Sequence, residues 1–476
     1  MHKPILLQDL SLSFSHKTCF ENFNARILPG SRIAIIGRNG SGKSSLLNIL
    51  QGTIEPTNGK LIIPEDLHIA ALPQMIEGSL SGGECFNQAL NDALNEYPDV
   101  LLLDEPTNHL DGKNRKALLQ LLHDFKGTLI VVSHDVELLR KNIDIFWHID
   151  QEQIHIFQGN YNDYMHEREQ QRLSLEHKKS QLNKQKKAIH QHLMQEQQRA
   201  AKSREKGEKS IDKRKWPTVG SKAKMARATT TSINNKAAMR NKGQNLTTQL
   251  SELYLPKIIT PRFSLNANIS RNQNLITVND GSIAYSHQAP ILSNINLCIS
   301  SHDRVAVRGN NGSGKSTLIK ALLFDATVIR SGEWLTPKIS DIGYLDQHYS
   351  TLINSDSALN TIQRIVPKWS ILEVRRHLTD FLFFNNEEVN THVSFLSGGE
   401  KARLSLAQIA AITPQLLILD EVTNNLDLES RAHVIQVLKD YPGALLVISH
   451  DEDFLIEIGT NDYYDIENRI LKYTTV

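Results

Sequence analysis

The chain has 476 residues, of which 40% are hydrophobic and 22% charged, and its formal net charge is +1 at pH 7. This length predicts two to four domains of ordinary globular composition. No apolar run approaches the roughly 18 residues that a membrane-spanning helix needs, and Met1–Leu10 lacks a secretory signal pattern, so we expect neither. The three scattered cysteines, Cys19, Cys85 and Cys298, argue against a disulfide framework or a zinc site and favour a reducing cytoplasm.

The first part of the chain alternates short apolar segments with helical patterns. Arg32–Ile36 predicts a strand, Leu46–Leu50 a helix beyond a glycine-rich loop, and Leu129–Val132 a further buried strand. Such alternation predicts an α/β domain with a largely parallel sheet.

Four motifs recur in the same order in the second half, which indicates a duplicated domain. GRNGSGKSS at Gly37–Ser45 recurs as GNNGSGKST at Gly309–Thr317, LSGGE at Leu80–Glu84 recurs at Leu396–Glu400, LLLDEPTNHLD at Leu101–Asp111 recurs as LILDEVTNNLD at Leu417–Asp427, and VVSHD at Val131–Asp135 recurs as VISHD at Val447–Asp451. The offset is 272 for the first motif and 316 for the others. Most of the difference is 43 extra residues in the second copy, between Gln347 and Leu396, where Ser370–Phe384 reads as helical.

Each glycine-rich motif matches GxxxxGK[ST] between a strand and a helix, the context of a phosphate-binding P-loop. Backbone amides of such a loop cradle phosphates at a helix N-terminus. We expect Lys43 and Lys315 against the β- and γ-phosphates, and Ser44 and Ser316 on Mg²⁺. The expected nucleotide-binding set is Gly37, Asn39, Gly40, Ser41, Gly42, Lys43, Ser44 and Ser45, and Gly309, Asn311, Gly312, Ser313, Gly314, Lys315, Ser316 and Thr317.

Acidic and histidine side chains follow other apolar strands in both copies. Asp104 and Asp420 are candidates to hold Mg²⁺, and the adjacent Glu105 and Glu421 to orient the attacking water. The alternative for each glutamate is a surface carboxylate at a strand end. His134 and His450 share one offset from these aspartates, which favours a γ-phosphate contact over a purely structural role.

These motifs resemble those of the ABC ATPase superfamily, and specifically its ABC-F branch, over nearly the whole chain. The resemblance implies that each LSGGE segment caps the nucleotide held by the opposite copy, so that Ser397, Gly398 and Gly399 complete the first site and Ser81, Gly82 and Gly83 the second. It also implies that Gln74 and Gln347 sense Mg²⁺ and the γ-phosphate. Phe14 and Tyr285 match the aromatic that stacks on adenine, although each could equally be a core residue.

Three features favour the ABC-F branch over a transporter subunit: two cassettes in one chain, no expected membrane segment, and a charged linker. Members of the branch bind the ribosome near the tRNA exit site, with the linker directed toward the P-site tRNA. The short first cassette resembles that of the antibiotic-resistance members. Val422 and Asn425 depart from the usual Pro and His, which leaves the relative rate of the second site open.

The segment between the copies is basic, with 21 Lys and Arg against 8 Asp and Glu from Asn160 to Asn245. Good helix formers fill 163–206, where leucine-type residues recur at Leu175, Leu182, Ile189 and Leu193, and a second helical stretch covers 222–253. Helix breakers predict a loop at about 207–221, with seven basic residues around Trp216. This hairpin either meets a nucleic acid or is a solvated spacer.

We therefore expect two tandem ABC-type P-loop cassettes, at 1–158 and 257–476, joined by a basic helical hairpin at 159–256. The sequence predicts a cytoplasmic, monomeric ATPase that uses ATP and Mg²⁺ and acts on ribosomal RNA and tRNA as a translation or ribosome-protection factor. The alternatives are the ATPase of a transporter with separate membrane subunits and a DNA-repair or chromosome ATPase. The scattered cysteines and the short linker disfavour the last class.

Overall fold

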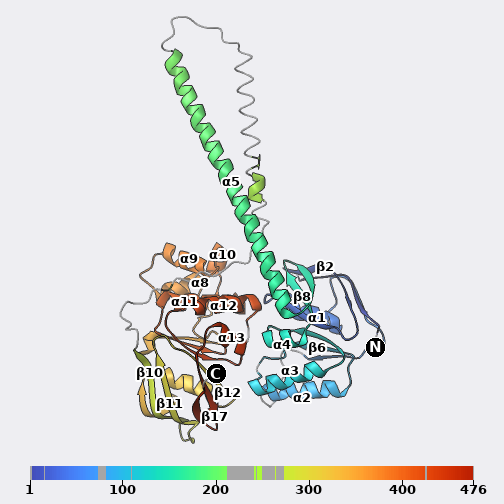
Figure 1. Cartoon of the computed structure of the whole chain (residues 1–476), viewed down its shortest axis with the longest axis vertical. Coiled ribbons are helices and arrows are strands. Elements are labelled where there is room, and N and C mark those ends of the chain that lie inside the picture. Colours follow the sequence, from blue (N-terminus) through green and yellow to red (C-terminus); the bar gives the residue numbers. More distant parts are fainter. Residues whose placement is uncertain are drawn as a thin grey trace. The chain divides into compact units, whose positions relative to one another are not determined.

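A computed structural model describes residues 3–14, 17–72, 82–108, 110–211, 241–242, 244–248, 263, 273–423 and 426–474. In this part of the chain, no helix combines the length and the apolar character needed to cross a membrane. The chain divides into two compact units, one of Met1–Tyr164 with Ile258–Val476 and one of Met165–Lys257. The first unit thus holds both copies of the repeat, and the second holds most of the linker (Figure 1).

The first cassette is built on two sheets. A three-stranded antiparallel sheet has the order β2 (Lys17–Ile27), β1 (Ile5–Phe14), β4 (Asn58–Ile62). A six-stranded sheet has the order β5 (Ile69–Leu72), β6 (Val100–Asp104), β7 (Thr128–Val132), β3 (Arg32–Gly37), β8 (Ile145–Asp150), β9 (Gln153–Gln158), and only its last pair is antiparallel. The helices of this cassette are α1 (Lys43–Gln51), α2 (Gly82–Asn95), α3 (Gly112–Asp124) and α4 (Val136–Asn142).

The parallel order places the functional loops together. Strands β6, β7 and β3 are neighbours, and buried Val, Leu and Ile residues fill them almost completely because both faces of the sheet are covered. Parallel strands end at the same edge, so the P-loop after β3, Asp104 at the end of β6 and His134 after β7 meet there. The predicted α/β architecture of this copy is confirmed.

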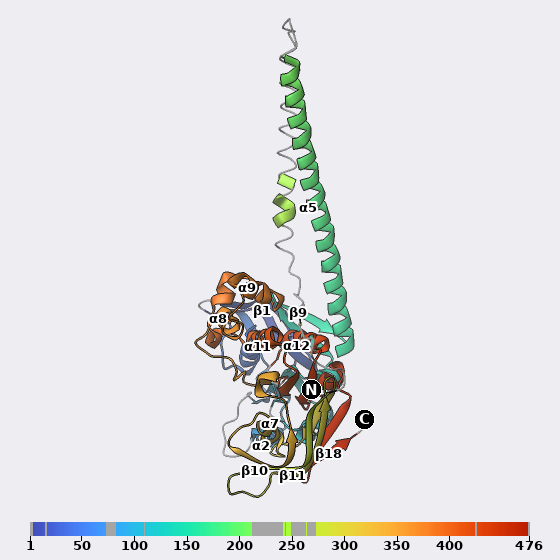
Figure 2. The ribbon, with the colours of Figure 1, turned by 90° about the vertical axis from the view of Figure 1, so that its left-hand side faces the viewer.

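The second cassette repeats this arrangement in one nine-stranded sheet. Its strand order is β13 (Val328–Leu335), β10 (Asn274–Tyr285), β11 (Leu292–Ser300), β18 (Ile470–Thr474), β17 (Asp462–Glu467), β12 (Arg304–Gly309), β16 (Ala444–Ile448), β15 (Leu416–Asp420), β14 (Ile342–Asp346). Strands β10, β11 and β18 lie side by side in Figure 2, as the pairing requires. The P-loop helix is α7 (Lys315–Leu322), and α12 (Leu428–Asp440) and α13 (Glu452–Glu457) follow the site strands.

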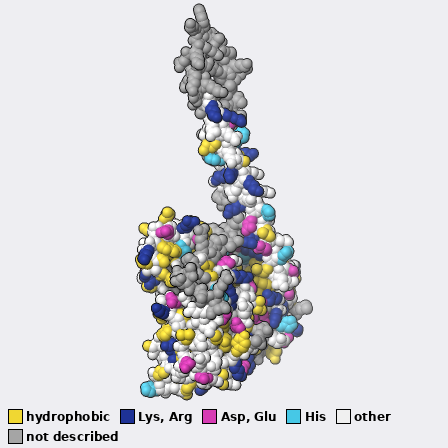
Figure 3. Space-filling model, turned by 60° about the vertical axis from the view of Figure 1, so that its left-hand side comes forward, with side chains coloured by type: hydrophobic (Ala, Val, Ile, Leu, Met, Phe, Trp, Pro, Cys, Tyr) yellow, Lys and Arg dark blue, Asp and Glu magenta, His cyan; other side chains and the backbone are white. Residues whose placement is uncertain are grey.

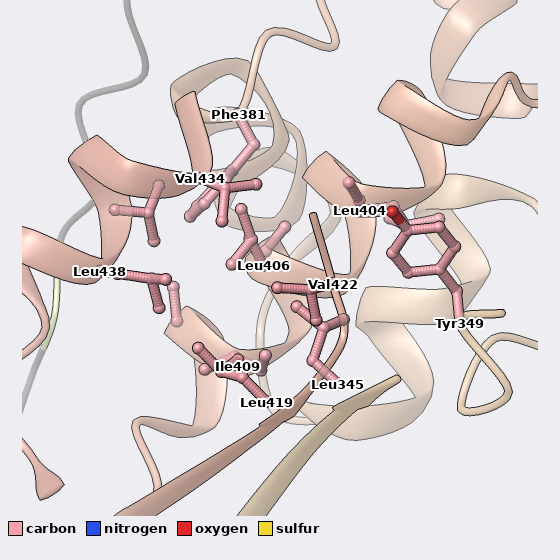
Figure 4. Close-up of a cluster of buried hydrophobic side chains, with 14 of the residues drawn as sticks. Leu345, Tyr349, Phe381, Leu404, Leu406, Ile409, Leu419, Val422, Val434 and Leu438 are labelled. Carbon is pink, nitrogen blue, oxygen red and sulfur yellow. The ribbon is translucent and has the colours of Figure 1, made fainter. Parts of the chain in front are cut away.

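The 43 extra residues of the second copy form a helical subdomain. It consists of α8 (Ala358–Ile365), α9 (Ile371–Asp380) and α10 (Asn386–Asn390), and it leads into α11 (Gly398–Ile412). Ser370 begins α9 with a reciprocal capping box to Glu373, which satisfies two backbone amides at the helix start. Figure 4 shows the core beneath, where Phe381 of the subdomain, Leu406 of α11 and Val434 of α12 come together. In the first copy, only nine residues separate β5 from α2.

The linker begins with a long helix, α5 (Tyr161–Ile211). Its first turn belongs to the first cassette because Tyr164 stacks on Phe146 with ring centroids 5.0 Å apart and its hydroxyl lies 3.1 Å from Nδ1 of His148. The helix continues through Gly207, so the prediction that a loop starts there is wrong. One glycine costs about 1 kcal/mol in a helix, which the good helix formers on both sides can offset.

The four residues of the predicted leucine stripe are less exposed than most residues of α5. Leu182 is buried within the second unit. Leu246, in a short helical segment of the second arm, is buried as well. Both burials agree with two arms that pack on each other. The predicted loop tip around Trp216 lies outside the described residues.

Candidate nucleotide-binding sites

The two P-loops have conformations that glycine alone adopts readily. Gly42, before α1, has φ of 98°, and a Cβ atom there would lie 2.8 Å from Cβ of Cys19. Gly314, before α7, has φ of 108°, and its Cβ would lie 2.9 Å from the Ile291 side chain. Each loop therefore passes closely over its own β-sheet before it enters the helix, and the first amides of the helix face the loop.

The P-loop lysines lie folded over their own loops. Nζ of Lys43 donates to the carbonyl oxygens of Gly37 and Arg38 at 2.9 and 3.0 Å, and Nζ of Lys315 donates to those of Gly309 and Asn310 at 2.7 and 3.1 Å. Burial lowers the pKa of both lysines, and the facing carboxylates, Glu105 in one site and Glu421 in the other, counteract it. The acidic neighbours favour the charged form of each buried lysine, and a charged lysine can bind a phosphate.

The glutamates at the strand ends have a strained backbone. Glu105 and Glu421 both have φ of 48°, in the left-handed region that few residues other than glycine adopt. Their amides donate to the carbonyl oxygens of Val132 at 2.8 Å and Ile448 at 2.9 Å on the neighbouring strands. The same conformation at equivalent positions, held by the same bond, fixes the backbone from which each carboxylate projects.

The acidic groups lie in a desolvated environment. Burial raises the pKa of Asp104, which a hydrogen bond with Ser44 and the charge of Lys43 partly oppose. Burial also raises the pKa of Glu105, and in the second site burial and Glu421 raise the pKa of Asp420 to about 6. A divalent cation would neutralise these buried carboxylates, so their raised pKa values are typical of a metal site.

The histidines stand beside the glutamates. Nε2 of His134 lies 3.5 Å from Oε1 of Glu105, and Nε2 of His450 lies 3.8 Å from Oε1 of Glu421. Burial, followed by the charge of the P-loop lysine, lowers the pKa of both histidines, so both rings are neutral at pH 7. A neutral ring can donate from one nitrogen and accept at the other.

Two arginines that the sequence analysis did not single out hold these histidines in place. Arg115 donates to both carboxylate oxygens of Asp135 at 2.6 Å, and Arg431 donates to those of Asp451 at 3.2 and 3.3 Å. Each aspartate directly follows its histidine and caps the next helix. A signal was present, because the two arginines are related by the offset of 316 and each follows Asp111 or Asp427 by four residues.

The first site also contains residues of the second cassette. The amide of Asn39 donates to Oδ2 of Asp427 at 2.9 Å, and a Cβ atom on Gly399 would lie 3.9 Å from the same oxygen. Ser397 caps α11 through a capping box with Glu400. The second signature segment therefore lies next to the first P-loop, and Asp111 in turn acts electrostatically on Lys315 and His450.

Comparisons with known proteins agree with this geometry. A family model described as ABC transporter matches residues 20–75 and 292–424. The chain is 30% identical to the ribosome protection protein VmlR of Bacillus subtilis over 98% of this chain and 87% of that protein. The chain belongs to the ABC-F family. It is also 29% identical to the probable ATP-binding protein YheS of Haemophilus influenzae (95% and 77% covered) and 27% identical to the ATP-binding protein Uup of Buchnera aphidicola (97% and 80% covered). This ABC-F chain is an ATPase.

Unsatisfied polar atoms of the ABC-F chain gather at the two sites. Among the described residues, ten buried side-chain nitrogen or oxygen atoms have no hydrogen-bond partner. Seven of them belong to predicted site residues: Oγ of Ser41 and of Ser313, Oδ1 of Asp104, both ring nitrogens of His134, Nε2 of Gln347 and Nε2 of His450. Because buried polar groups normally have partners, this set fits a phosphate ligand with a divalent cation.

The second site opens into a cavity of about 830 Å³. It is lined by the second P-loop, Glu421 and the segments 288–291 and 466–469. Tyr285 is not among the lining residues; its ring faces Nζ of Lys320 at 5.9 Å. Phe14 is 48% exposed. The adenine-stacking role of both aromatics stays a prediction.

The first signature segment of this ABC-F chain is described only in part. Gln74 and Ser81 lie outside the described residues, as does Asn425, while Gly82 and Gly83 begin α2. The first signature segment, and with it the completion of the second site, therefore stays a prediction from the family resemblance.

Proposed function

We propose that this ABC-F ATPase acts on the ribosome, as a translation factor or an antibiotic ribosome-protection factor. In this proposal, ATP lies between the P-loop of one cassette and the signature segment of the other. ATP binding favours the closed, ribosome-bound form, and hydrolysis releases it. The similarity to a ribosome protection protein over 98% of the chain is the observation that supports it most strongly.

The proposed reaction uses the residues described above. Lys43 and Lys315 would contact the β- and γ-phosphates, with Ser44 and Asp104, or Ser316 and Asp420, holding Mg²⁺. Bound there, Mg²⁺ would supply positive charge against the negative charge of the transition state. Glu105 and Glu421 would orient the attacking water, and the neutral His134 and His450 would hydrogen-bond the γ-phosphate.

The charge of the linker helix favours a polyanionic partner. Between Glu176 and Glu196, α5 has no acidic residue, and all five of its lysines there are exposed: Lys178, Lys179, Lys184, Lys186 and Lys187. Figure 3 shows Lys and Arg side chains spread along the described part of this helix. Such a surface binds nucleic-acid phosphates without regard to sequence, as expected for ribosomal RNA or tRNA.

The proposal is tested by trapping the ATP-bound form. The combined variant Glu105→Gln and Glu421→Gln should co-sediment with ribosomes in ATP, because it binds nucleotide and does not hydrolyse it. It should not do so in ADP. Failure of the variant to co-sediment in ATP, when nucleotide binding is intact, would reject the ribosomal role.

The linker is tested in the same background. Lys184→Glu, Lys186→Glu and Lys187→Glu together should weaken the binding and reduce its salt dependence. The matched control reverses three exposed cassette lysines that form no ion pair with a described residue: Lys60, Lys338 and Lys368. Equal losses in the two triple variants would indicate a general charge effect and would count against the helix as the contact surface.

One observation favours the alternative, an ATPase coupled to separate membrane subunits. The helical subdomain of the second cassette exposes large apolar side chains, with Leu372 77% and Ile371 57% exposed at the start of α9. The first cassette has only nine residues in the corresponding interval, so at most one coupling surface is available. Stimulation of hydrolysis by a membrane fraction, with no response to ribosomes, would favour this alternative.

A further inference from the structure

The ion pairs between the two cassettes all join a basic residue of the first to an acidic residue of the second. Among the residues that the structure describes, three ion pairs join them: Arg38 with Glu429 at 2.6 Å, Lys116 with Glu452 at 3.4 Å, and Arg140 with Asp453 at 3.1 Å. Two hydrogen bonds accompany them, from the amide of Asn39 to Asp427 and from Arg115 to the carbonyl oxygen of His450. In every one, the donor belongs to the first cassette and the acceptor to the second.

The internal repeat shows that this direction is not inherited from the duplication. The repeat equivalents of Lys116 and Arg140 are Ala432 and Ile456, and the equivalent of Glu452 is Val136. At the equivalent positions with the two cassettes exchanged, none of the three ion pairs can form. Asp111 and Asp427, by contrast, are related by the repeat, and each acts on a residue of the opposite site.

Pairing of like cassettes from two chains would lack most of these interactions. Between two second cassettes, Glu452 would meet Ala432, and Asp453 would meet Ile456. Between two first cassettes, Arg38 would meet Lys113 and Lys116 would meet Val136. Arg140 alone of the three would meet an acidic residue, Glu137, which already pairs with Lys141 at 2.9 Å. Unpaired or like charges across an interface discriminate against the wrong partner more strongly than exposed pairs stabilise the right one.

We propose that the closing faces form a charge-matched pair, with a basic face on the first cassette (Arg38, Lys116, Arg140) and an acidic face on the second (Glu429, Glu452, Asp453). This match selects unlike cassettes, so that each chain closes on itself and like cassettes of different chains do not pair. The inference does not depend on the ribosomal partner. Because the side chains of these pairs are 27 to 68% exposed, their effect lies in partner choice and closing rate and decreases with salt.

The test uses the full chain with Glu105→Gln and Glu421→Gln, in ATP, with closing followed by energy transfer between dyes on the two cassettes. Reversal of the basic face (Lys116→Glu with Arg140→Glu) or of the acidic face (Glu452→Lys with Asp453→Lys) should lower the closing equilibrium constant roughly tenfold or more at low salt. The fourfold swap should restore closing to within about threefold. Lys141→Glu is the matched control, because Lys141 pairs inside its own cassette with Glu137 at 2.9 Å.

Mixing the two single-face reversals tests partner choice directly. One protein then has two acidic faces and the other two basic faces, so an equimolar mixture should form a two-chain species that light scattering detects and that neither protein forms alone. Unchanged closing in the reversals, or a fourfold swap as defective as the reversals, would overturn the inference. Absence of the two-chain species would overturn the claim that charge chooses the partner.

Discussion

Replacement of Arg115 by methionine should destabilise the first cassette strongly. Arg115 and Asp135 are 11% and 8% exposed, and two bonds of 2.6 Å join them. Methionine keeps most of the volume and removes the charge, which leaves a buried carboxylate supported mainly by the amide of Leu138 at 3.1 Å. Breaking such a pair costs about 3–5 kcal/mol, whereas removing both charges costs much less.

The assay can isolate the first cassette. Trp147 is the only tryptophan in 1–158 and is 2% exposed in β8, so its fluorescence reports unfolding of this domain once the other three, Trp216, Trp334 and Trp369, are phenylalanine. A urea slope of about 2 kcal/mol per molar converts the expected loss into a midpoint shift of about 2 M. The double variant with Asp135→Asn should recover about 1–3 kcal/mol of it.

The control is an exposed pair of equal length. Arg172 pairs with Glu169 on α5 at 2.6 Å, with side chains 27% and 49% exposed, and Arg172→Met should change the midpoint by less than about 0.3 M. A shift below about 0.5 M for Arg115→Met, or strictly additive effects with Asp135→Asn, would refute the reasoning that this buried pair acts as a unit.

Four further outcomes are expected. Although burial raises the pKa of Asp135, Arg115 lowers it more, so the folded-state pKa lies below the usual value. The stability that this carboxylate contributes is therefore present above about pH 3.9 and is lost as the pH falls through the folded-state pKa. Urea midpoints measured between about pH 3 and 6 should show a smaller loss on acidification in Arg115→Met than in the unmodified chain. Gly42→Ala should abolish ATP protection of the first cassette in thermal unfolding, because its Cβ would clash with Cys19. Val422→Ala should destabilise the second cassette by about 1–3 kcal/mol in urea, since this 3% exposed side chain packs in the core of Figure 4. Lys17→Gln should weaken ATP binding about fivefold in a Lys315→Ala background, measured by titration, because Nζ of Lys17 lies on the first P-loop, 2.7 Å from the carbonyl oxygen of Gly40.

Features that depend on local chemistry could be predicted from the sequence. Glycines at required left-handed positions, a P-loop lysine before a helix, and carboxylates at the ends of apolar strands identify themselves by residue type and spacing. The repeat then predicted the duplicated fold, since each motif had to occur in the same strand order twice. The helix start at Ser370 was also predictable, because a capping box is encoded within four residues.

Features that depend on distant partners could not be predicted. The repeat marks Arg115 and Arg431 as equivalent positions, but their role is apparent only when the fold brings Asp135 or Asp451 beside them. The end of α5 was predicted too early, because one glycine in a helix has a small cost that its neighbours can offset. The direction of the charges between the cassettes requires knowledge of which surfaces meet, and the sequence alone does not contain it.

The same comparison of equivalent positions indicates that the two nucleotide sites differ in charge. The first P-loop region has Arg38 and Lys17, where the second has Asn310 and Gln288. Arg38 pairs with Glu429 of the second cassette at 2.6 Å, and Lys17 lies on the first P-loop, so both cations lie beside the first phosphate loop. The second site has Lys315 and Arg469, both of which line its 830 Å³ cavity together with Gln288. The cations beside the phosphate loop thus differ in identity and position, so the two sites should differ in ATP affinity, and titration of the Lys43→Ala and Lys315→Ala variants measures each site alone.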